Sequence, residues 1–218
     1  MSHVLADLPV AAQLNIGCEM YEFKRVRELE DRRLYLYGEI AAFDEDERGL
    51  YYDVAPISRL AEIILDFNRR DDGIPPEERE PIRLYINSPG GDVAEGFALI
   101  SAMELSKTPI YTINIGEWMS MAFLIGIVGR KRFSLPHSIF MMHEPSGLAI
   151  GKFSDMEDRV NFNRRFNNDH IRALVMRNSQ MSEKEYSEVS KKDYYMLPED
   201  ALKHGFIDEI VTDIDSIL

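Results

Sequence analysis

The chain has little of several features that assign proteins to whole classes. It holds one cysteine, Cys18, in 218 residues, which excludes an internal disulfide and fits a reducing compartment. Its longest apolar stretch, Trp118 to Val128, is too short to cross a bilayer as a helix, and no basic n-region followed by an apolar segment opens the sequence. We therefore expect a cytoplasmic protein that does not associate with membranes.

Basic residues are also in deficit. The chain has 38 acidic against 25 basic residues and a net charge of -13, and a field of that sign repels phosphate backbones. Nucleic acid is therefore not an expected partner. With 45% hydrophobic residues, the chain can bury one sizeable core without disulfides or metal ions, and a single domain is the default expectation.

Strand-like and helical patterns alternate along the chain. Short β-rich runs recur at Leu34 to Ile40, Ile82 to Asn87, Ile110 to Gly116, Ser138 to His143 and Phe206 to Val211. Helical patterns occupy Ile57 to Phe67, after Pro56, and Asp92 to Ser106. This alternation predicts an α/β fold. The charged, proline-rich segment Arg69 to Pro81 is predicted to be an exposed loop.

Further helices are predicted in the second half. Ser154 with Glu157 and Ser182 with Glu185 both fit a capping box, in which the serine caps free amides and the acid reaches back. The first of these helices is predicted from Asp155 to about Arg177, with a heavily charged surface. A projecting helix of that length favours packing on another subunit, although a long surface helix on one domain is the alternative. A short last helix is bracketed by Pro198 and Gly205.

A serine stands in an unusual place. Ser120 follows a strand-like run and begins the strongly apolar Met121 to Ile125, which predicts a buried helix with the hydroxyl in its first turn. Free amides at a helix start point toward negative charge, so the Met121 amide is a candidate donor to an oxyanion. The paired glycines before Asp92 let backbone approach a ligand, which makes the Gly91 amide a second candidate. A tight turn is the alternative explanation of the glycines.

A base and an acid complete the candidate site. His143 ends a strand-like run and precedes Glu144-Pro145, a junction where catalytic groups are commonly presented. A lone histidine there is also a common structural hydrogen-bonder. Asp193 supplies a carboxylate that could orient the base, although pattern alone does not select it over Asp200 or Asp208. The three side chains suggest a serine peptidase, for which we expect no metal or cofactor.

Four motifs together resemble one known family. They are Tyr85-Ile86-Asn87-Ser88-Pro89-Gly90-Gly91, the segment Gly116 to Met121 with its Ser-Met pair, Met142-His143-Glu144-Pro145, and Asp193 through Gly205-Phe206-Ile207-Asp208. Their joint spacing resembles the proteolytic subunit of the ATP-dependent Clp protease over roughly Leu34 to Val211. The chain order serine, histidine, aspartate differs from that of chymotrypsin, subtilisin and α/β-hydrolases.

The resemblance implies a fold, an assembly and a set of roles. The fold would be the crotonase/Clp-type spiral of repeated ββα units with a projecting long helix, in one catalytic domain over 34–218 after a divergent N-terminal segment, 1–33. The assembly would be a homo-oligomer of two stacked heptameric rings around a chamber, which cuts polypeptide substrates and is fed by an AAA+ unfoldase. The resemblance makes Ser120 the nucleophile, His143 the base and Asp193 the orienting acid, with the Gly91 and Met121 amides as the oxyanion hole.

The chain also departs from the family pattern. Glu117-Trp118-Met119 replaces smaller residues or glutamine before the serine, and we expect this change to reshape the substrate pocket. Lys192 stands where family members carry arginine, Arg83 replaces an aromatic residue expected in the unfoldase groove, and an insertion is placed near 43–54. Two alternatives remain open: a non-catalytic or regulatory subunit of a mixed ring, and a crotonase-type acyl-CoA enzyme.

Overall fold

The computed structural model describes residues 31–40, 57–145 and 150–218. These residues form one seven-stranded sheet in which β1, β2, β3, β4 and β7 lie side by side and parallel. β5 also pairs in parallel with β3, alongside its last residues. Only β6 is antiparallel among the described strands, and it pairs with β5. The strands are β1 Arg33–Ile40, β2 Ile82–Gly91, β3 Ile110–Met119, β4 Lys131–Ser134, β5 Ile139–Met142, β6 Tyr194–Met196 and β7 Glu209–Ile210.

The mixed α/β architecture confirms the coarse fold prediction. The predicted runs at 34–40, 82–87, 110–116 and 138–143 all became strands, and β2 and β3 extend further toward their carboxyl ends than predicted. The run 206–211 contributes only the two residues of β7, while the short β4 and β6 were not anticipated. The repeated ββα spiral stays a prediction, as does the division of the chain at residue 34.

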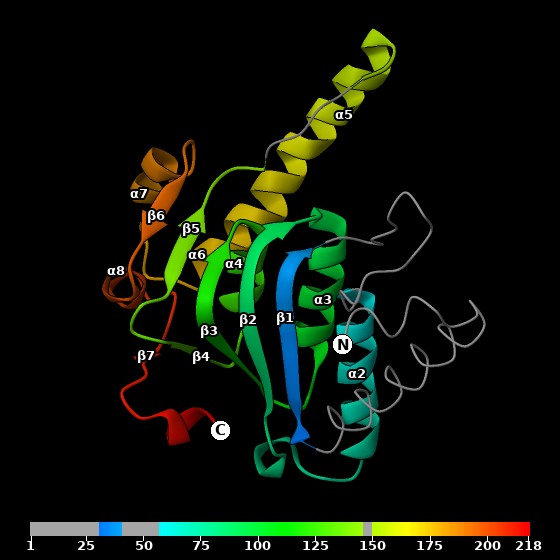
Figure 1. Ribbon diagram of the computed structural model, residues 1–218. Coiled ribbons are helices and arrows are strands. Elements are labelled where there is room, and N and C mark those ends of the chain that lie inside the picture. Colours follow the sequence, from blue (N-terminus) through cyan, green and yellow to red (C-terminus); the bar gives the residue numbers. More distant parts are fainter. Residues whose placement is uncertain (1–30, 41–56, 146–149) are drawn as a thin grey trace, which may run out of the picture.

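One face of the sheet is covered by helices (Figure 1). Alternate strand residues such as Leu34, Leu36, Leu84 and Ile86 join the main core there, because successive side chains of a strand point to opposite faces. The covering helices are α2 Ile57–Arg70, α3 Val93–Leu105 and α4 Met121–Gly126. The predictions of helices at 57–67 and 92–106 are confirmed, and the Asp92 side chain caps α3 by accepting from the Glu95 amide at 2.9 Å.

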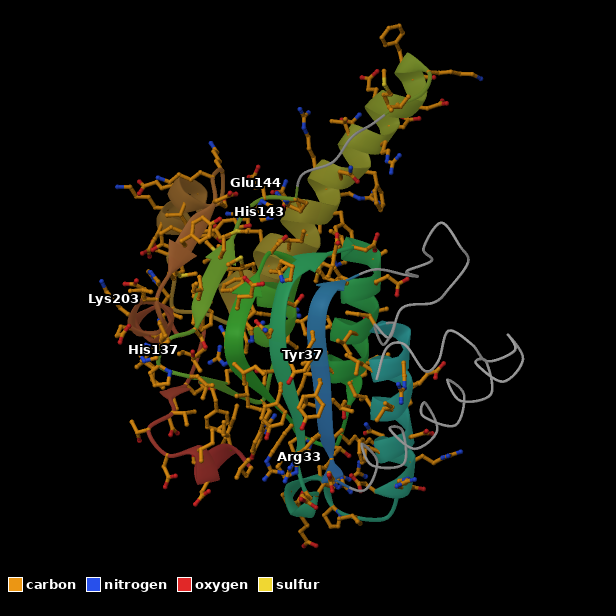
Figure 2. All side chains as sticks on the ribbon, in the orientation of Figure 1. Arg33, Tyr37, His137, His143, Glu144 and Lys203 are labelled. Atoms are coloured by element: carbon orange, nitrogen blue, oxygen red, sulfur yellow. The ribbon has the colours of Figure 1, made fainter. Side chains whose placement is uncertain are left out.

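The opposite face has a smaller apolar cluster. Tyr85, Ile113 and Phe133 pack there with Val211 and Ile217 from the C-terminal part of the chain. The short 3-10 turn η3, Ile214–Ile217, is tied to the sheet by a hydrogen bond from the Tyr85 hydroxyl to the Ile217 carbonyl. Arg33 and Tyr37 lie along β1 in Figure 2, at a distance from His143 and Glu144, which lie beyond the end of β5.

A long helix projects from the body of the molecule (Figure 1). It consists of α5 Phe153–Phe166, the π-helical segment η2 Asn167–Arg172 and α6 Ala173–Arg177, close to the predicted bounds. Ile171, Leu174 and Val175 are buried at its base, while Val160 is 40% exposed. The outer part of the projecting helix, α5, buries none of its residues against the rest of the chain.

The two predicted capping boxes had different outcomes. Ser182 caps α7, Glu183–Val189, and its hydroxyl accepts from the Glu185 amide at 3.2 Å. The Ser154 cap is wrong, because α5 begins two residues earlier than predicted, at Phe153, and the Ser154 hydroxyl donates to Asp155 instead. The last predicted helix is α8, Pro198–Lys203, with Pro198 in its first turn and Gly205 at φ 72° just after it.

The prediction that 69–81 is an exposed loop is wrong at two charged residues. Asp71 and Arg79 are buried, and the 3-10 turn η1, Pro76–Glu78, lies between them. Arg32 donates to the two Asp71 oxygens at 2.5 and 3.0 Å, and the Thr108 hydroxyl donates to the same carboxylate at 2.7 Å. A buried charge is tolerated when its oxygens are paired in this way, which composition alone does not reveal.

Among the helices that the structure describes, none combines the length and the apolar character that a membrane span needs. Cys18, the insertion predicted near 43–54 and most of the predicted N-terminal segment lie outside the described residues.

Candidate active site

Ser120 occupies a strained turn between a strand and a helix. It directly follows β3 and precedes α4, and its backbone has φ 50° and ψ −118°. A non-glycine residue at such angles carries a free-energy penalty of about 1–3 kcal/mol and is found preferentially at functional sites. The turn is fixed by the Ser120 amide, which donates to the Met141 carbonyl at 2.9 Å. A sharp strand-to-helix turn of this kind exposes a serine hydroxyl.

Two asparagines hold the end of β3 that leads to Ser120. The Asn87 side-chain oxygen accepts from the Glu117 amide at 3.1 Å, and that of Asn114 accepts from the Gly116 amide at 3.0 Å. A Cβ on Gly116 would lie 2.2 Å from the Asn87 oxygen, so this position requires glycine. These contacts were not predicted, because the register sets Asn114 opposite Ile86 rather than Asn87 and no sequence pattern relates the two asparagines.

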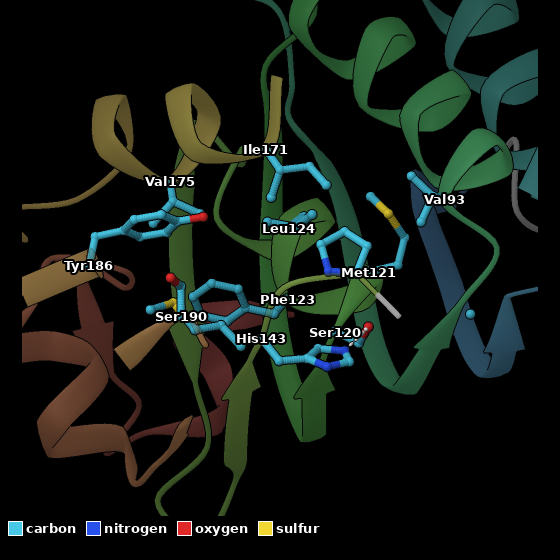
Figure 3. A pocket seen from close by; sticks show the side chains of 13 residues that line it. Val93, Ser120, Met121, Phe123, Leu124, His143, Ile171, Val175, Tyr186 and Ser190 are labelled. Atoms are coloured by element: carbon cyan, nitrogen blue, oxygen red, sulfur yellow. Dashed lines mark hydrogen bonds between the residues drawn. The ribbon is translucent and has the colours of Figure 1, made fainter. Parts of the chain in front are cut away.

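His143 lies against the serine. Its Nε2 is 2.8 Å from the Ser120 Oγ, which is hydrogen-bonding distance (Figure 3). The strand before it, β5, pairs with the end of β3, with Met119 opposite Met141. After it, the Glu144 amide donates to the Ser190 carbonyl at 2.8 Å. The backbone on both sides of the imidazole is therefore anchored.

Asp193 lies on the other side of the imidazole. Tyr194 is opposite Met142 in the antiparallel β5–β6 pair, and the same register carried one step further sets Asp193 opposite His143. The distance between His143 Nδ1 and Asp193 Oδ1 is 3.6 Å, longer than a hydrogen bond, and the Asp193 side chain is 58% exposed. The structure thus brings all three side chains together, with the acid as the most loosely held member.

The paired glycines pass directly beside Ser120. Gly90 has φ 98°, and a Cβ there would lie 2.7 Å from the Met119 carbonyl and 2.8 Å from the Ser120 Cβ, so only glycine fits. The sequence analysis singled out Gly91 and overlooked this role of Gly90. The amide after Gly91, that of Asp92, donates to the Ile40 carbonyl on β1 at 2.7 Å.

A cavity of about 90 Å³ opens beside the serine and histidine (Figure 3). Its walls are mainly apolar and include Met121, Leu124, Ile171 and Val175, while Tyr186 and Ser190 add hydroxyl groups. Burial raises the pKa of the Tyr186 phenol, and nearby Glu144 raises it further, so this hydroxyl stays protonated at neutral pH. The cavity has room for a small apolar group next to the Ser120 hydroxyl.

The residues just before Ser120 do not line this cavity. Glu117, Trp118 and Met119 are absent from its walls among the described residues, and Trp118 is fully buried with its ring edge-on to Phe140 at 5.5 Å. Trp118, the largest of the three, thus packs into the core, and the expectation that these residues reshape the substrate pocket stays a prediction.

A serine hydroxyl within hydrogen-bonding distance of an imidazole, beside a cavity, is the arrangement used by hydrolases that form acyl-enzymes. Within residues 31–40, 57–145 and 150–218, no group of three or more His, Cys, Asp or Glu side chains is placed to hold a metal ion. The Clp protease family model matches residues 76–213 of the chain. The chain therefore belongs to the Clp protease family, and it is a peptidase of the Clp kind.

Proposed function

We propose that the protein is a serine endopeptidase in which Ser120, His143 and Asp193 act as a catalytic triad. His143 Nε2 removes the hydroxyl proton as Ser120 Oγ attacks the peptide carbonyl, and the protonated imidazole then gives that proton to the leaving amine. Water attacks the resulting ester, again with His143 as base, and releases the acyl group. Asp193 holds the imidazole tautomer and favours its charged form.

The observation that carries the proposal is the 2.8 Å separation of His143 Nε2 and Ser120 Oγ at a serine with φ 50°. Strain at one residue and a base at its hydroxyl are independent features. A serine with a purely structural role needs neither of them. Their coincidence favours nucleophilic catalysis.

Two backbone amides are proposed to form the oxyanion hole. The Met121 amide starts α4 and has no acceptor within its own helix, and the Gly91 amide belongs to the glycine pair that passes beside Ser120. Both residues line the cavity beside Ser120. Donors fixed before the reaction stabilise the developing negative charge, and loss of one reduces the rate by about 10²–10³-fold.

The proposed substrates are unfolded polypeptides and short peptides, and the apolar cavity favours a small apolar side chain next to the scissile bond. The family to which the chain belongs supports a ring-shaped chamber, for which we propose two stacked heptamers fed by an AAA+ unfoldase. Exposed Phe153 and Phe162 on the projecting helix support contacts between subunits, because large apolar side chains on an extended arm are typical of interfaces. We propose the cytoplasm as the location.

Replacement of Ser120 by alanine tests the mechanism. Ser120→Ala is expected to abolish both cleavage of a fluorogenic peptide and labelling by a fluorophosphonate, because no other oxygen takes the place of Oγ. Ser154→Ala, on the exposed surface of α5, is the matched control and should keep both activities. Peptide turnover retained in Ser120→Ala would refute the assignment.

The same assay separates the alternatives. If the unmodified chain neither cleaves peptides nor reacts with the fluorophosphonate, it is a non-catalytic subunit that needs a sister chain. Binding of an acyl-CoA without peptide cleavage would instead indicate a crotonase-type enzyme. Free digestion of a folded protein by the isolated chain would contradict the closed chamber.

A further inference from the structure

Asp193 lies in a short connection between two elements, α7 and β6, that each place a side chain next to the same histidine, His204. The connection, residues 190–193, joins α7 to β6. On the β6 side, the Tyr194 hydroxyl is 3.2 Å from His204 Nε2. On the α7 side, Glu185 Oε1 is 3.6 Å from His204 Nδ1. His204 itself follows α8 as its C-cap, so three elements meet at this one imidazole.

The side chain and the backbone of His204 are both held in place by neighbouring residues. Its side chain is 11% exposed, and its ring contacts both Tyr194 and Phe206. Its carbonyl accepts from the Gln180 amide at 2.7 Å, and its amide donates to the Asp200 carbonyl at 3.0 Å. The backbone at residue 204 is therefore fixed without help from the imidazole, and changes to the side chain can be made without unfolding α8.

The two ring nitrogens suit their two neighbours. A neutral imidazole has one donor and one acceptor, so with a proton on Nδ1 it directs a donor at the Glu185 carboxylate and accepts from the Tyr194 hydroxyl. Burial raises the pKa of the Tyr194 phenol, and the carboxylates of Asp200 and Glu185 raise it further. The phenol therefore remains a donor over the neutral range. Glu185, Tyr194 and Asp200 are the titratable groups around this imidazole that the described contacts identify.

We propose that His204 is a positioning residue for the reaction: through its hydrogen bond with Tyr194, at the start of β6, and its approach to Glu185, in the first turn of α7, it holds together the two elements that flank the connection carrying Asp193 and so sets the distance from Asp193 to His143. The inference rests on the function proposed above. It accounts for how an acid that is 58% exposed, and 3.6 Å from its imidazole, is kept in register with that imidazole. No contact of His204 with substrate is involved.

The first test measures kcat/KM for a fluorogenic peptide in three variants of the full chain. His204→Ala should lower kcat/KM by about 10- to 100-fold, because misplacement of a catalytic group by about 1 Å has effects up to that size. Tyr194→Phe, which removes one hydroxyl and keeps the ring, should lower it by about fivefold. His204→Gln, which retains a donor and an acceptor, should recover most of the rate lost in His204→Ala. Lys203→Ala, an exposed neighbour on α8 labelled in Figure 2, is the control.

The second test asks whether the effect passes through Asp193. In an Asp193→Ala background, His204→Ala and Tyr194→Phe should cause no further loss in the rate of fluorophosphonate labelling, because residues that act through one group are non-additive. A purely structural role would instead reduce the rate by the same factor in both backgrounds and would overturn the proposal.

The outcomes of the two proposals can be told apart. If Ser120→Ala remains active, the proposed function fails. If Ser120→Ala is inactive while His204→Ala and Tyr194→Phe match the unmodified chain, the function stands and only the role of His204 fails. Native mass and melting temperature are measured for every variant, and Tyr194→Phe decides the question if His204→Ala does not fold.

Discussion

The two sides of His143 are built differently. The helix-covered sheet delivers Gly91 and Ser120 at the ends of β2 and β3, two strands of ten residues that each pair with a neighbour on both sides. The C-terminal segment, residues 182–205, delivers Asp193 beside a strand of three residues, between helices of seven and six. Long paired strands fix the nucleophile, whereas the acid depends on one short strand pair, β5 with β6, and, by our proposal, on side-chain contacts with His204. Changes in the first region should therefore affect stability, and changes in the second should affect rate.

The largest effect is expected for Asp193→Asn. Without the carboxylate, the imidazole loses the charge that favours its protonated form, and we expect kcat to fall by about 10⁴-fold. The free energy of unfolding should change little, because Asp193 is more than half exposed. Peptide cleavage and urea unfolding measure the two quantities. Asp158→Asn, the same chemical change on exposed α5, is the control, and a large loss of stability in Asp193→Asn would break the comparison.

The next largest effect is expected in the helix-covered sheet, as a decrease in the free energy of unfolding. Asp71→Asn removes a buried carboxylate that accepts from Arg32 and Thr108, and it should lower the free energy of unfolding at pH 7 by about 2–3 kcal/mol. The site lies at the opposite end of the sheet from Ser120, so kcat below the unfolding transition should be unchanged. Asp72→Asn, at an exposed neighbouring position, should have no effect on either quantity.

The pH dependence of this stability has a definite sign. Hydrogen bonding to Arg32 lowers the pKa of Asp71 in the folded protein. The contribution of this carboxylate is therefore present above its ordinary pKa of about 3.9 and is lost as the pH falls below that value. Between pH 5 and pH 3, Asp71→Asn should lose less stability than the unmodified chain, in parallel urea titrations. Equal losses in the two proteins would show that Asp71 is not the group that titrates.

The smallest effect concerns the two serines that look alike in sequence. Ser182→Ala removes the cap of α7 and should lower the free energy of unfolding by about 1 kcal/mol, whereas Ser154→Ala should leave it unchanged. Urea unfolding of the two variants side by side checks this difference. An equal loss in both variants would mean that the Ser182 cap does not stabilise α7.

The sequence predicted the parts of the molecule whose local pattern agrees with their surroundings. The apolar runs of β1, β2 and β3 and the amphipathic α2 were found because burial and periodicity point the same way there. β4 and β6, with four and three residues, are too short to show a period, and they exist only because neighbouring strands pair with them. The burial of Asp71 was not predicted for a related reason, since its partner Arg32 is 39 residues away in the chain.

The candidate site likewise has residues that the sequence pattern predicts and residues that it does not. Ser120 and His143 lie at ends of strands, where the pattern of the chain marks them, and the structure brings them to 2.8 Å. Asp193 could not be chosen from pattern because a solvated aspartate in a loop is common, and only the pairing of β6 with β5 sets it opposite His143. Gly90 was missed since its role depends on a backbone angle and on the closeness of Ser120.

The π-helical segment within the projecting helix has a geometric consequence. An α-helix advances by about 100° of rotation per residue, and a wider π turn accommodates an additional residue while the helix continues. Asn167–Arg172 therefore shifts the angular phase of everything beyond it. Phe153 and Phe162 therefore lie on a different side of the helix, relative to Leu174 and Val175 at the base, than they would on a continuous α-helix. Deleting one residue from the segment would swing the outer arm by about a quarter turn and re-aim its aromatic side chains.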